Sequence, residues 1–181
     1  MVYDSEIHHR RSIRLKNYDY SQPGAYFITI CTHNGTSIFG NVLNDQMCLN
    51  DNGEIVQRLW NTLPERFPTV ELDFYVVMPN HIHGIVVQAI HQQISSTDNS
   101  RMHKQTFKQP TRSELGQIIR TFKAAATCLI RAAGTPEFAW ERNYYEHVIR
   151  NERDLERIRQ YMVDNPACWV EDKLRRGEDM T

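Results

Sequence analysis

Residues 72–88 read LDFYVVMPNHIHGIVVQ and describe two β-strands in direct succession. β-Branched and aromatic residues are dense in both halves, Leu72–Met78 and His81–Gln88, which is typical of strands. Pro79-Asn80 interrupts them with turn chemistry. The segment therefore predicts two consecutive strands, the second of which opens on a pair of histidines.

The residues that precede this segment predict further strands and a helix. The expected elements are, in order, a strand over Ala25–Thr32 buried on both faces, a strand pair over Ser37–Leu43 and Gln46–Leu49, a turn at Asn50–Gly53, and a helix to about Arg66 whose last turn Pro64 ends or kinks.

The residues that follow predict two helices. Thr111-x-x-Glu114 matches a capping box, apolar residues then recur at helical spacing, and Gly134 stops the helix. A short strand is expected over Phe138–Trp140. Asn151 is the expected cap of the last helix, which Pro166 terminates.

The order of these elements predicts an α+β fold of the ferredoxin-like or RRM-like sandwich type. A mainly antiparallel sheet would carry helices packed on one face, and the C-terminal helix over 151–165 would be added to it. The length of 181 residues suits a single domain. It would include a basic N-terminal arm over 1–19 and a mobile polar loop over 89–110.

Composition excludes several other classes of protein. The chain has no apolar run long enough to span a membrane, and its N-terminus lacks the apolar core of a secretory signal. Its four cysteines lack CxxC spacing, which argues against a zinc knuckle or a disulfide framework. We therefore expect a cytoplasmic, nucleoid-associated protein with core or inert thiols.

The distribution of charge is more informative than the net charge of −1. From Arg101 to Arg131 there are seven basic residues and a single acidic residue, Glu114. Such segregation indicates either a DNA-binding surface or a solvated helix face beside a polar loop.

His81-Ile82-His83 is the sharpest local feature. Alternate residues of a strand share a face, so both imidazoles project side by side, about 7 Å apart along the strand, and Ile82 points into the core. Two imidazoles at this spacing can reach one metal ion, such as Mn, Co or Zn, with a third ligand from elsewhere. The alternative is a pair of ordinary polar residues on an exposed strand face.

The last helix offers a second pair of functional groups. Tyr161 and Asn165 are one turn apart on the same face, offset from the apolar stripe of Leu155, Ile158 and Met162. A metal ion can help a phenol attack a phosphate, and an amide oxygen is a suitable hard ligand. The alternatives are a half-buried tyrosine with a solvated hydroxyl and an ordinary helix-terminal asparagine.

Several separated motifs together resemble a known family. VVMPNHIHGIVV (76–87) resembles the motif of the HUH single-strand nucleases, and WERNYYEHVIRNERDLERIRQYMVDNP (140–166) resembles the C-terminal signature of the REP-associated tyrosine transposases. The N-terminal HRRSIRLKNYDY and GAYFITICT resemble the same family, so the resemblance spans about Arg10 to Trp169.

This resemblance implies a set of site residues. Tyr161 would be the nucleophile, and His81, His83 and Asn165 would hold a divalent metal ion, Mg²⁺ or Mn²⁺. Tyr144 and Tyr145 are rival tyrosines, which we interpret as scaffold or DNA contacts. His147 is given no catalytic role.

The resemblance also implies a partner, single-stranded DNA with REP-like palindromic hairpins, and is compatible with a monomer or a homodimer. A metal-dependent endonuclease and strand transferase that forms a 5′-phosphotyrosine link is the predicted function. The candidate DNA contacts, each of which has solvated surface charge as its alternative, are Arg10, Arg11, Arg14, Lys16, Arg120, Lys123, Arg131 and Arg150.

Two other functions remain open at this point. One is a metal phosphodiesterase that uses water and keeps Tyr161 as a structural residue. The other is a hairpin-binding protein without catalysis.

Overall fold

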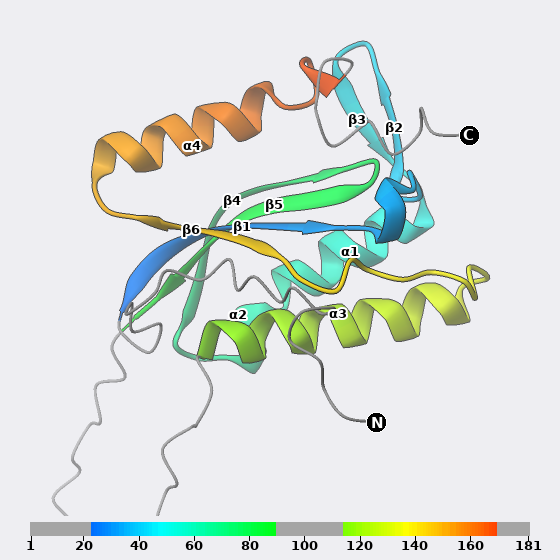
Figure 1. Ribbon diagram of the computed structural model, residues 1–181, viewed down its shortest axis with the longest axis horizontal. Coiled ribbons are helices and arrows are strands. Elements are labelled where there is room, and N and C mark those ends of the chain that lie inside the picture. Colours follow the sequence, from blue (N-terminus) through cyan, green and yellow to red (C-terminus); the bar gives the residue numbers. More distant parts are fainter. Residues whose placement is uncertain (1–22, 90–113, 170–181) are drawn as a thin grey trace, which may run out of the picture.

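One four-stranded sheet organises the chain in the computed structural model, which describes residues 23–89 and 114–169 (Figure 1). A short 3-10 turn at His33–Gly35 follows the first strand. The remaining elements are β1 (Gly24–Cys31), β2 (Gly40–Leu43), β3 (Gln46–Leu49), α1 (Asp51–Asn61), α2 (Leu63–Arg66), β4 (Val70–Met78), β5 (His81–Gln88), α3 (Glu114–Ala132), β6 (Tyr145–Ile149) and α4 (Glu152–Asp164).

The main sheet has the strand order β4-β5-β1-β6, and every neighbouring pair in it is antiparallel. With α1 between β1 and β4 and α3 between β5 and β6, this is the βαββαβ arrangement of the ferredoxin-like fold. The predicted fold class is confirmed. The β2–β3 hairpin is a separate two-stranded sheet inserted between β1 and α1.

The two faces of the sheet carry different helices. Figure 1 shows α1, α2 and α3 on one side of the sheet and α4 on the other. Apolar residues of α1 and α3, among them Trp60 and Phe122, form the large core with β1 and β5. On the opposite face Ile158 and Met162 of α4 pack against Phe27 and Ile85. The central strands are therefore buried on both faces, as the apolarity of β1 predicts.

The helix boundaries follow the expected signals. The side chain of Asn50 accepts a hydrogen bond from the Gly53 amide at the start of α1, and Asn151 accepts one from the Asp154 amide at the start of α4. The break between α1 and α2 falls at Thr62, next to the segment that contains Pro64. The Asn151 cap and the proline-linked break are as predicted, whereas the turn predicted at Asn50–Gly53 is instead the capped first turn of α1.

The structure corrects the prediction between α3 and α4. A strand over Phe138–Trp140 is wrong, because only one isolated bridge, between Trp140 and Thr32, forms there. The strand that does form, β6, was not predicted. Its buried residues alternate with exposed or half-buried ones, and polar Tyr145, Glu146 and His147 hide the apolar pattern of an edge strand.

Two further predictions need adjustment. The strand predicted over Ser37–Leu43 begins only at Gly40. The four cysteines are free, as expected, but Cys48, Cys128 and Cys168 are exposed and so are not core residues. The basic arm over 1–19 and nearly all of the loop over 89–110 lie outside the described residues.

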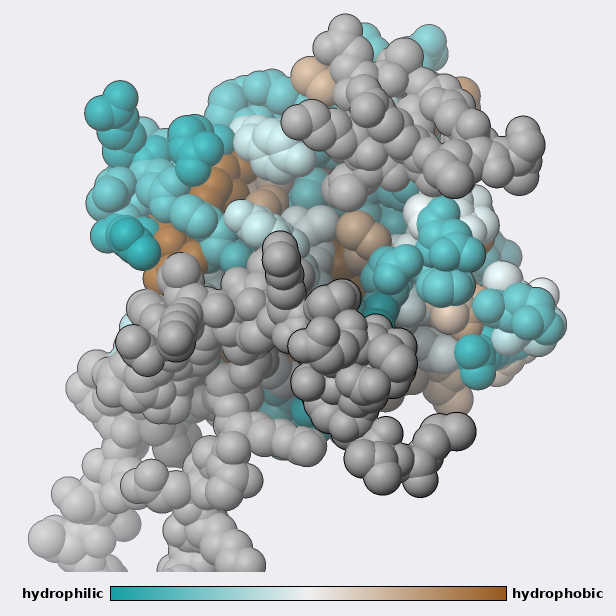
Figure 2. Space-filling view, in the orientation of Figure 1, coloured by the Kyte–Doolittle hydropathy of each residue, from teal (hydrophilic) through white to brown (hydrophobic). Residues whose placement is uncertain are grey.

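The helix α4 is strongly amphipathic. In Figure 2 hydrophilic residues cover its outward side, while hydrophobic residues show beneath them toward the sheet. Ile158 and Met162 supply the buried side. Within the described residues, no helix is both long and apolar enough to cross a membrane.

Gly84 provides a test of how tightly β5 packs against Trp60 on the core face of the sheet. A Cβ atom at Gly84 would lie 2.4 Å from the Trp60 ring, which is fully buried and has no room to move. We expect Gly84→Ala to lower the free energy of unfolding by about 1–3 kcal/mol, as over-packing does. Urea denaturation would measure it.

The double variant Gly84→Ala/Trp60→Phe is the matched control, since the smaller ring makes room for the methyl group. Because the two residues are in direct contact, we expect the change in unfolding free energy of the double variant to be smaller than the sum of the changes in the two single variants. Strictly additive losses would contradict the packing described here.

Candidate active site

Three strands place one row of side chains on the face of the sheet that α4 covers. Thr29 of β1 pairs with His83 of β5 on one side and with Tyr145 of β6 on the other. Paired residues of neighbouring strands point to the same face. His81 lies in the next row, opposite Cys31. The site is therefore built on the rigid centre of the sheet.

The two histidines are buried and face each other. His81 is fully buried, His83 is 2% exposed, and their Nε2 atoms lie 3.0 Å apart. Ile82 between them lies in the core on the other face, as predicted. Exposed polar residues are therefore the wrong interpretation of this motif.

Each imidazole has a partner for its other ring nitrogen. The Nδ1 atom of His81 lies 2.8 Å from the side-chain oxygen of Asn80, and Nδ1 of His83 lies 2.8 Å from the hydroxyl of Thr29. The amide nitrogen of Asn80 donates to the Gly35 carbonyl, which orients the amide. Metal-binding histidines commonly have such partners, which orient the ring and select the tautomer.

The hydrogen-bond partners fit one arrangement of protons on the two rings. An amide oxygen only accepts, so His81 must carry its proton on Nδ1 and have a lone pair on Nε2. The short contact between the two Nε2 atoms then requires His83 to donate from Nε2 and to accept from the Thr29 hydroxyl at Nδ1. If His83 moves its proton to Nδ1, Thr29 becomes the acceptor and the two Nε2 lone pairs face each other, and this is the tautomer in which both Nε2 atoms can bind one metal ion.

Burial keeps both imidazoles neutral. It lowers the pKa of His83 to about 3, and it lowers the pKa of His81 well below the usual value, with a smaller contribution from neighbouring His83. A neutral imidazole is the form that binds a metal ion.

Tyr161 reaches this pair from α4. Its hydroxyl oxygen lies 3.3 Å from Nε2 of His83, and its ring meets the rings of His83 and Phe27 edge-on. The side chain is nevertheless 47% exposed. The phenol is therefore open to a substrate from solvent while its ring packs against the site.

Two side-chain contacts hold α4 in place above the sheet. Arg159 makes a bidentate contact with Asp73, at the irregularity in β4, with Nε 2.8 Å from one carboxylate oxygen. At the other side His147 of β6 lies 2.8 Å from the Asp154 carboxylate. The Asp73 pKa is lowered mainly by its hydrogen bond to Arg159. His147, which was given no catalytic role, thus supports the tyrosine helix.

Asn165 ends α4 one turn beyond Tyr161. It is 3% exposed, and its Oδ1 atom has no hydrogen-bond partner among the described residues. A buried amide oxygen without a partner is costly unless it has a ligand. Within the described part of the chain, no group of three or more His, Cys, Asp or Glu side chains is arranged to hold a metal ion. The candidate ligands are therefore the two imidazoles, which are in contact, and one buried amide oxygen on α4, one turn beyond Tyr161.

The rival tyrosines line the same cavity as Tyr161. Tyr144 comes just before β6 and Tyr145 begins it, whereas the hydroxyl near His83 belongs to Tyr161. The geometry therefore favours Tyr161 over the other two as a group that acts with the histidines.

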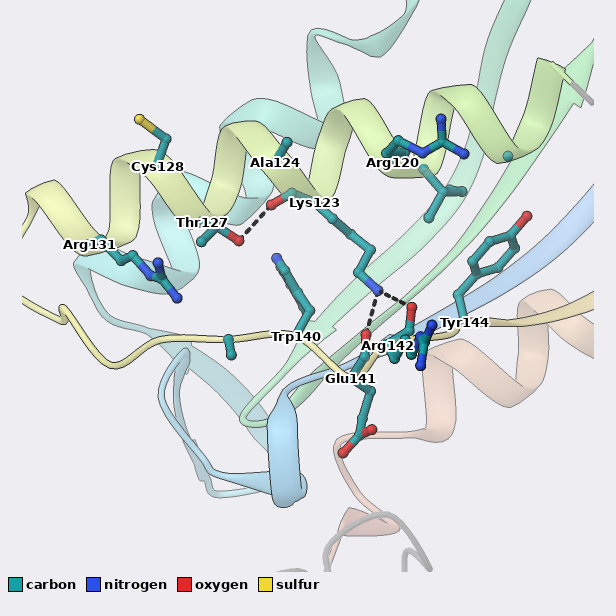
Figure 3. Close-up of a pocket in the computed structure, with 13 residues that line it drawn as sticks. Arg120, Lys123, Ala124, Thr127, Cys128, Arg131, Trp140, Glu141, Arg142 and Tyr144 are labelled. Atoms are coloured by element: carbon teal, nitrogen blue, oxygen red, sulfur yellow. Dashed lines mark hydrogen bonds between the residues drawn. The ribbon is translucent and has the colours of Figure 1, made fainter. Parts of the chain in front are cut away.

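A groove of about 750 Å³ lies between α3 and the segment 139–144 (Figure 3). Arg120, Lys123 and Arg131 line it, together with Arg142, which was not predicted. Lys123 donates to the carbonyls of Glu141 and Asn143, and burial lowers its pKa, so it mainly holds the chain in place.

Arg131 also has a structural contact, because its Nε donates to the Phe138 carbonyl. Arg120 and Arg150 are exposed, on α3 and just after β6. Arg10, Arg11, Arg14 and Lys16 lie outside the described residues.

Comparison with known proteins gives a relative and a fold. The chain is 43% identical over 175 residues to an uncharacterized protein of Haemophilus influenzae, with 95% of this chain and 96% of that protein covered. The chain therefore belongs to the same family as this protein. No protein-family model matches it.

A REP-associated tyrosine transposase, whose structure is bound to a REP hairpin, has the same fold. The TM-score is 0.55 at 19% identity, and the match covers 88% of this chain and 76% of that one. The resemblance read from the sequence is thus confirmed in the fold.

The buried histidine pair predicts acid lability. A histidine whose pKa is lowered by folding binds its proton in the unfolded chain first, so folding is favoured above the unfolded pKa and loses stability as pH falls. We expect the free energy of unfolding in EDTA to fall steadily from about pH 6.5 toward the His83 pKa of about 3. Urea titrations at several pH values would measure this.

The His83→Gln variant should have a shallower dependence on pH than the wild type. His33→Gln is the matched control, because the His33 side chain is 58% exposed. Equal slopes for wild type and His83→Gln would contradict a neutral buried imidazole.

Proposed function

We propose that this protein cuts and rejoins single-stranded DNA as a transposase, with the phenol of Tyr161 as its nucleophile. The observation that carries the proposal is the Tyr161 hydroxyl 3.3 Å from Nε2 of a buried, neutral histidine pair. The fold shared with a REP-associated tyrosine transposase supports it.

We propose further that His81, His83 and Asn165 hold Mg²⁺ or Mn²⁺. The facing Nε2 atoms and the buried Asn165 oxygen without a partner fit this role. Imidazole nitrogens suit Mn²⁺ well, whereas Mg²⁺ prefers oxygen ligands such as phosphate and water. When bound, the ion would offset the charge that develops on the scissile phosphate.

The protein's own groups would act as follows. The Tyr161 oxygen attacks phosphorus, a P–O bond forms, and the bond to the 3′ oxygen breaks. The products are a 5′-phosphotyrosine and a free 3′-OH, and the 3′-OH of another strand can reverse the step. His83 is proposed as a metal ligand, so its lone pair does not take the phenol proton. That proton leaves to water, which reaches the half-exposed Tyr161, and water supplies a proton to the 3′ oxygen.

The docking of α4 supports action within one chain. Its apolar side packs on Phe27 and Ile85 of the same sheet, and Arg159 contacts Asp73 of the same chain. The nucleophile and the histidines of one molecule then form a complete site, which a monomer can use.

The proposed substrate is a DNA hairpin with a single-stranded flank. The structural relative is bound to a REP hairpin. In this chain Arg120 and Arg142 present guanidinium groups at the groove beside α3, suited to phosphates.

Replacement of Tyr161 tests the reaction class. With a labelled hairpin library and Mg²⁺ or Mn²⁺, the wild type should form a covalent adduct on a denaturing gel. Tyr161→Phe should form none, because it lacks the attacking oxygen. Tyr75→Phe is the matched control, since it removes a phenolic oxygen from a ring that packs with Trp60 on the other face.

The other outcomes distinguish the alternatives. Cleavage without an adduct, retained in Tyr161→Phe, would identify a phosphodiesterase that uses water. Tight hairpin binding without cleavage in any divalent metal would identify a DNA-binding protein without catalysis.

Thr29 tests the metal site independently of activity. Thr29→Val keeps the shape but removes the hydroxyl that contacts Nδ1 of His83. The Kd for Mn²⁺, measured by electron paramagnetic resonance without DNA, should rise about 10- to 100-fold. Thr29→Ser keeps the hydroxyl and should bind Mn²⁺ like the wild type. Equal affinity of the Val variant would exclude a role for Thr29 in positioning His83.

A further inference from the structure

A second cavity, of about 490 Å³, adjoins the histidine pair and Tyr161. Four of its lining residues are phenylalanine or tyrosine. The rings come from Phe27 on the sheet, Tyr144 and Tyr145 at the start of β6, and Tyr161 on α4. Tyr145 is 48% exposed, which leaves its ring open to a ligand.

Besides Thr29 and His83 on the sheet, the polar groups of the cavity come from one short segment. Glu141, Arg142 and Asn143 line the cavity just before β6. Lys123 holds this segment from behind by donating hydrogen bonds to the backbone carbonyls of all three residues. Figure 3 shows the Lys123 side chain reaching from α3 to this segment. The cavity wall is therefore anchored to the core helix.

The same segment joins this cavity to the groove beside α3. Glu141, Arg142 and Tyr144 line both spaces. Arg120 and Arg131 line the groove, eleven residues and so about 16 Å apart along the helix axis. An aromatic cavity next to the nucleophile thus continues into a groove with cationic sides.

We propose that the cavity holds one unstacked base of the single-stranded substrate, beside the phosphate that Tyr161 attacks, and that the strand continues past Arg142 into the groove. The proposal rests on the proposed function and names a subsite of it. Bases stack on aromatic rings, whereas phosphates require cations, and Arg142 is the one Lys or Arg residue that lines the cavity in the described part of the chain. Polar groups beside the rings suit the edge of a flipped base.

Abasic scanning tests this subsite through binding alone. The probe is the tightest-binding fluorescein-labelled hairpin oligonucleotide recovered from a random-flank library with Tyr161→Phe, which keeps the ring at position 161. Each flanking base is replaced in turn by an abasic site, and Kd is measured by fluorescence anisotropy. We expect one position, adjacent to the cleavage point mapped with the wild type, to lose affinity about 5- to 150-fold.

Tyr145 is the proposed stacking partner of that base, and Tyr145→Ala, made in the Tyr161→Phe protein, tests this role. Abasic substitution at the sensitive position should then cost little further affinity, because the ring on which the base stacks is gone. Tyr145→Phe keeps the ring and should restore the loss. Phe74→Ala is the matched control, since Phe74 is 39% exposed on β4, the other edge of the sheet.

Two results would overturn the base subsite. One is an equal Kd at every abasic position. The other is a sensitive position at which the abasic loss of affinity is the same in Tyr145→Ala, although this variant keeps the wild-type melting temperature. If either accompanies a wild-type Tyr161 adduct, only the subsite fails. If no adduct forms but the position still couples to Tyr145, the proposed function fails and base binding stands.

Discussion

Contact between two buried imidazoles on β5 is the constraint on which the rest of the site depends. His81 and His83 lie inside the protein without charge, and each requires a partner for its second nitrogen. Thr29 on the neighbouring strand and Asn80 in the β4–β5 turn meet that requirement. The α4 helix closes the site by placing Tyr161 against His83.

The same strand must serve both faces of the sheet. Ile82 and Gly84 face the large core, where the missing side chain of Gly84 admits the ring of Trp60. His81 and His83 alternate with them toward α4. Packing on the core side thus fixes the position of β5. Because the strand is held rigidly, the Nε2 atoms of His81 and His83 on its other face stay close together.

The sequence predicts those parts of the site that depend on local periodicity. The alternation His81-Ile82-His83 and the one-turn spacing of Tyr161 and Asn165 follow from strand and helix geometry, and the structure has both. The roles of Thr29 and Asn80 were not predicted, because they depend on the register between strands and on a turn conformation. Strand β6 was missed because polar residues lie on both sides of this edge strand, Tyr145 and His147 on one side and buried Glu146 on the other. The contact between Asp73 and Arg159 joins residues 86 positions apart, which no local pattern reveals.

Gly84 has a consequence for how this protein would appear in a genetic screen. It directly follows the histidine pair, yet its backbone faces the tryptophan on the reverse side of the sheet. Inactivating mutations would therefore cluster along β5. In that cluster, residues that perform chemistry alternate along the chain with residues that only make room for a neighbouring side chain. Separating the two groups requires a measurement of folding alongside activity, since proximity in sequence to a reactive residue is no guide to function when successive side chains belong to opposite sides of a sheet.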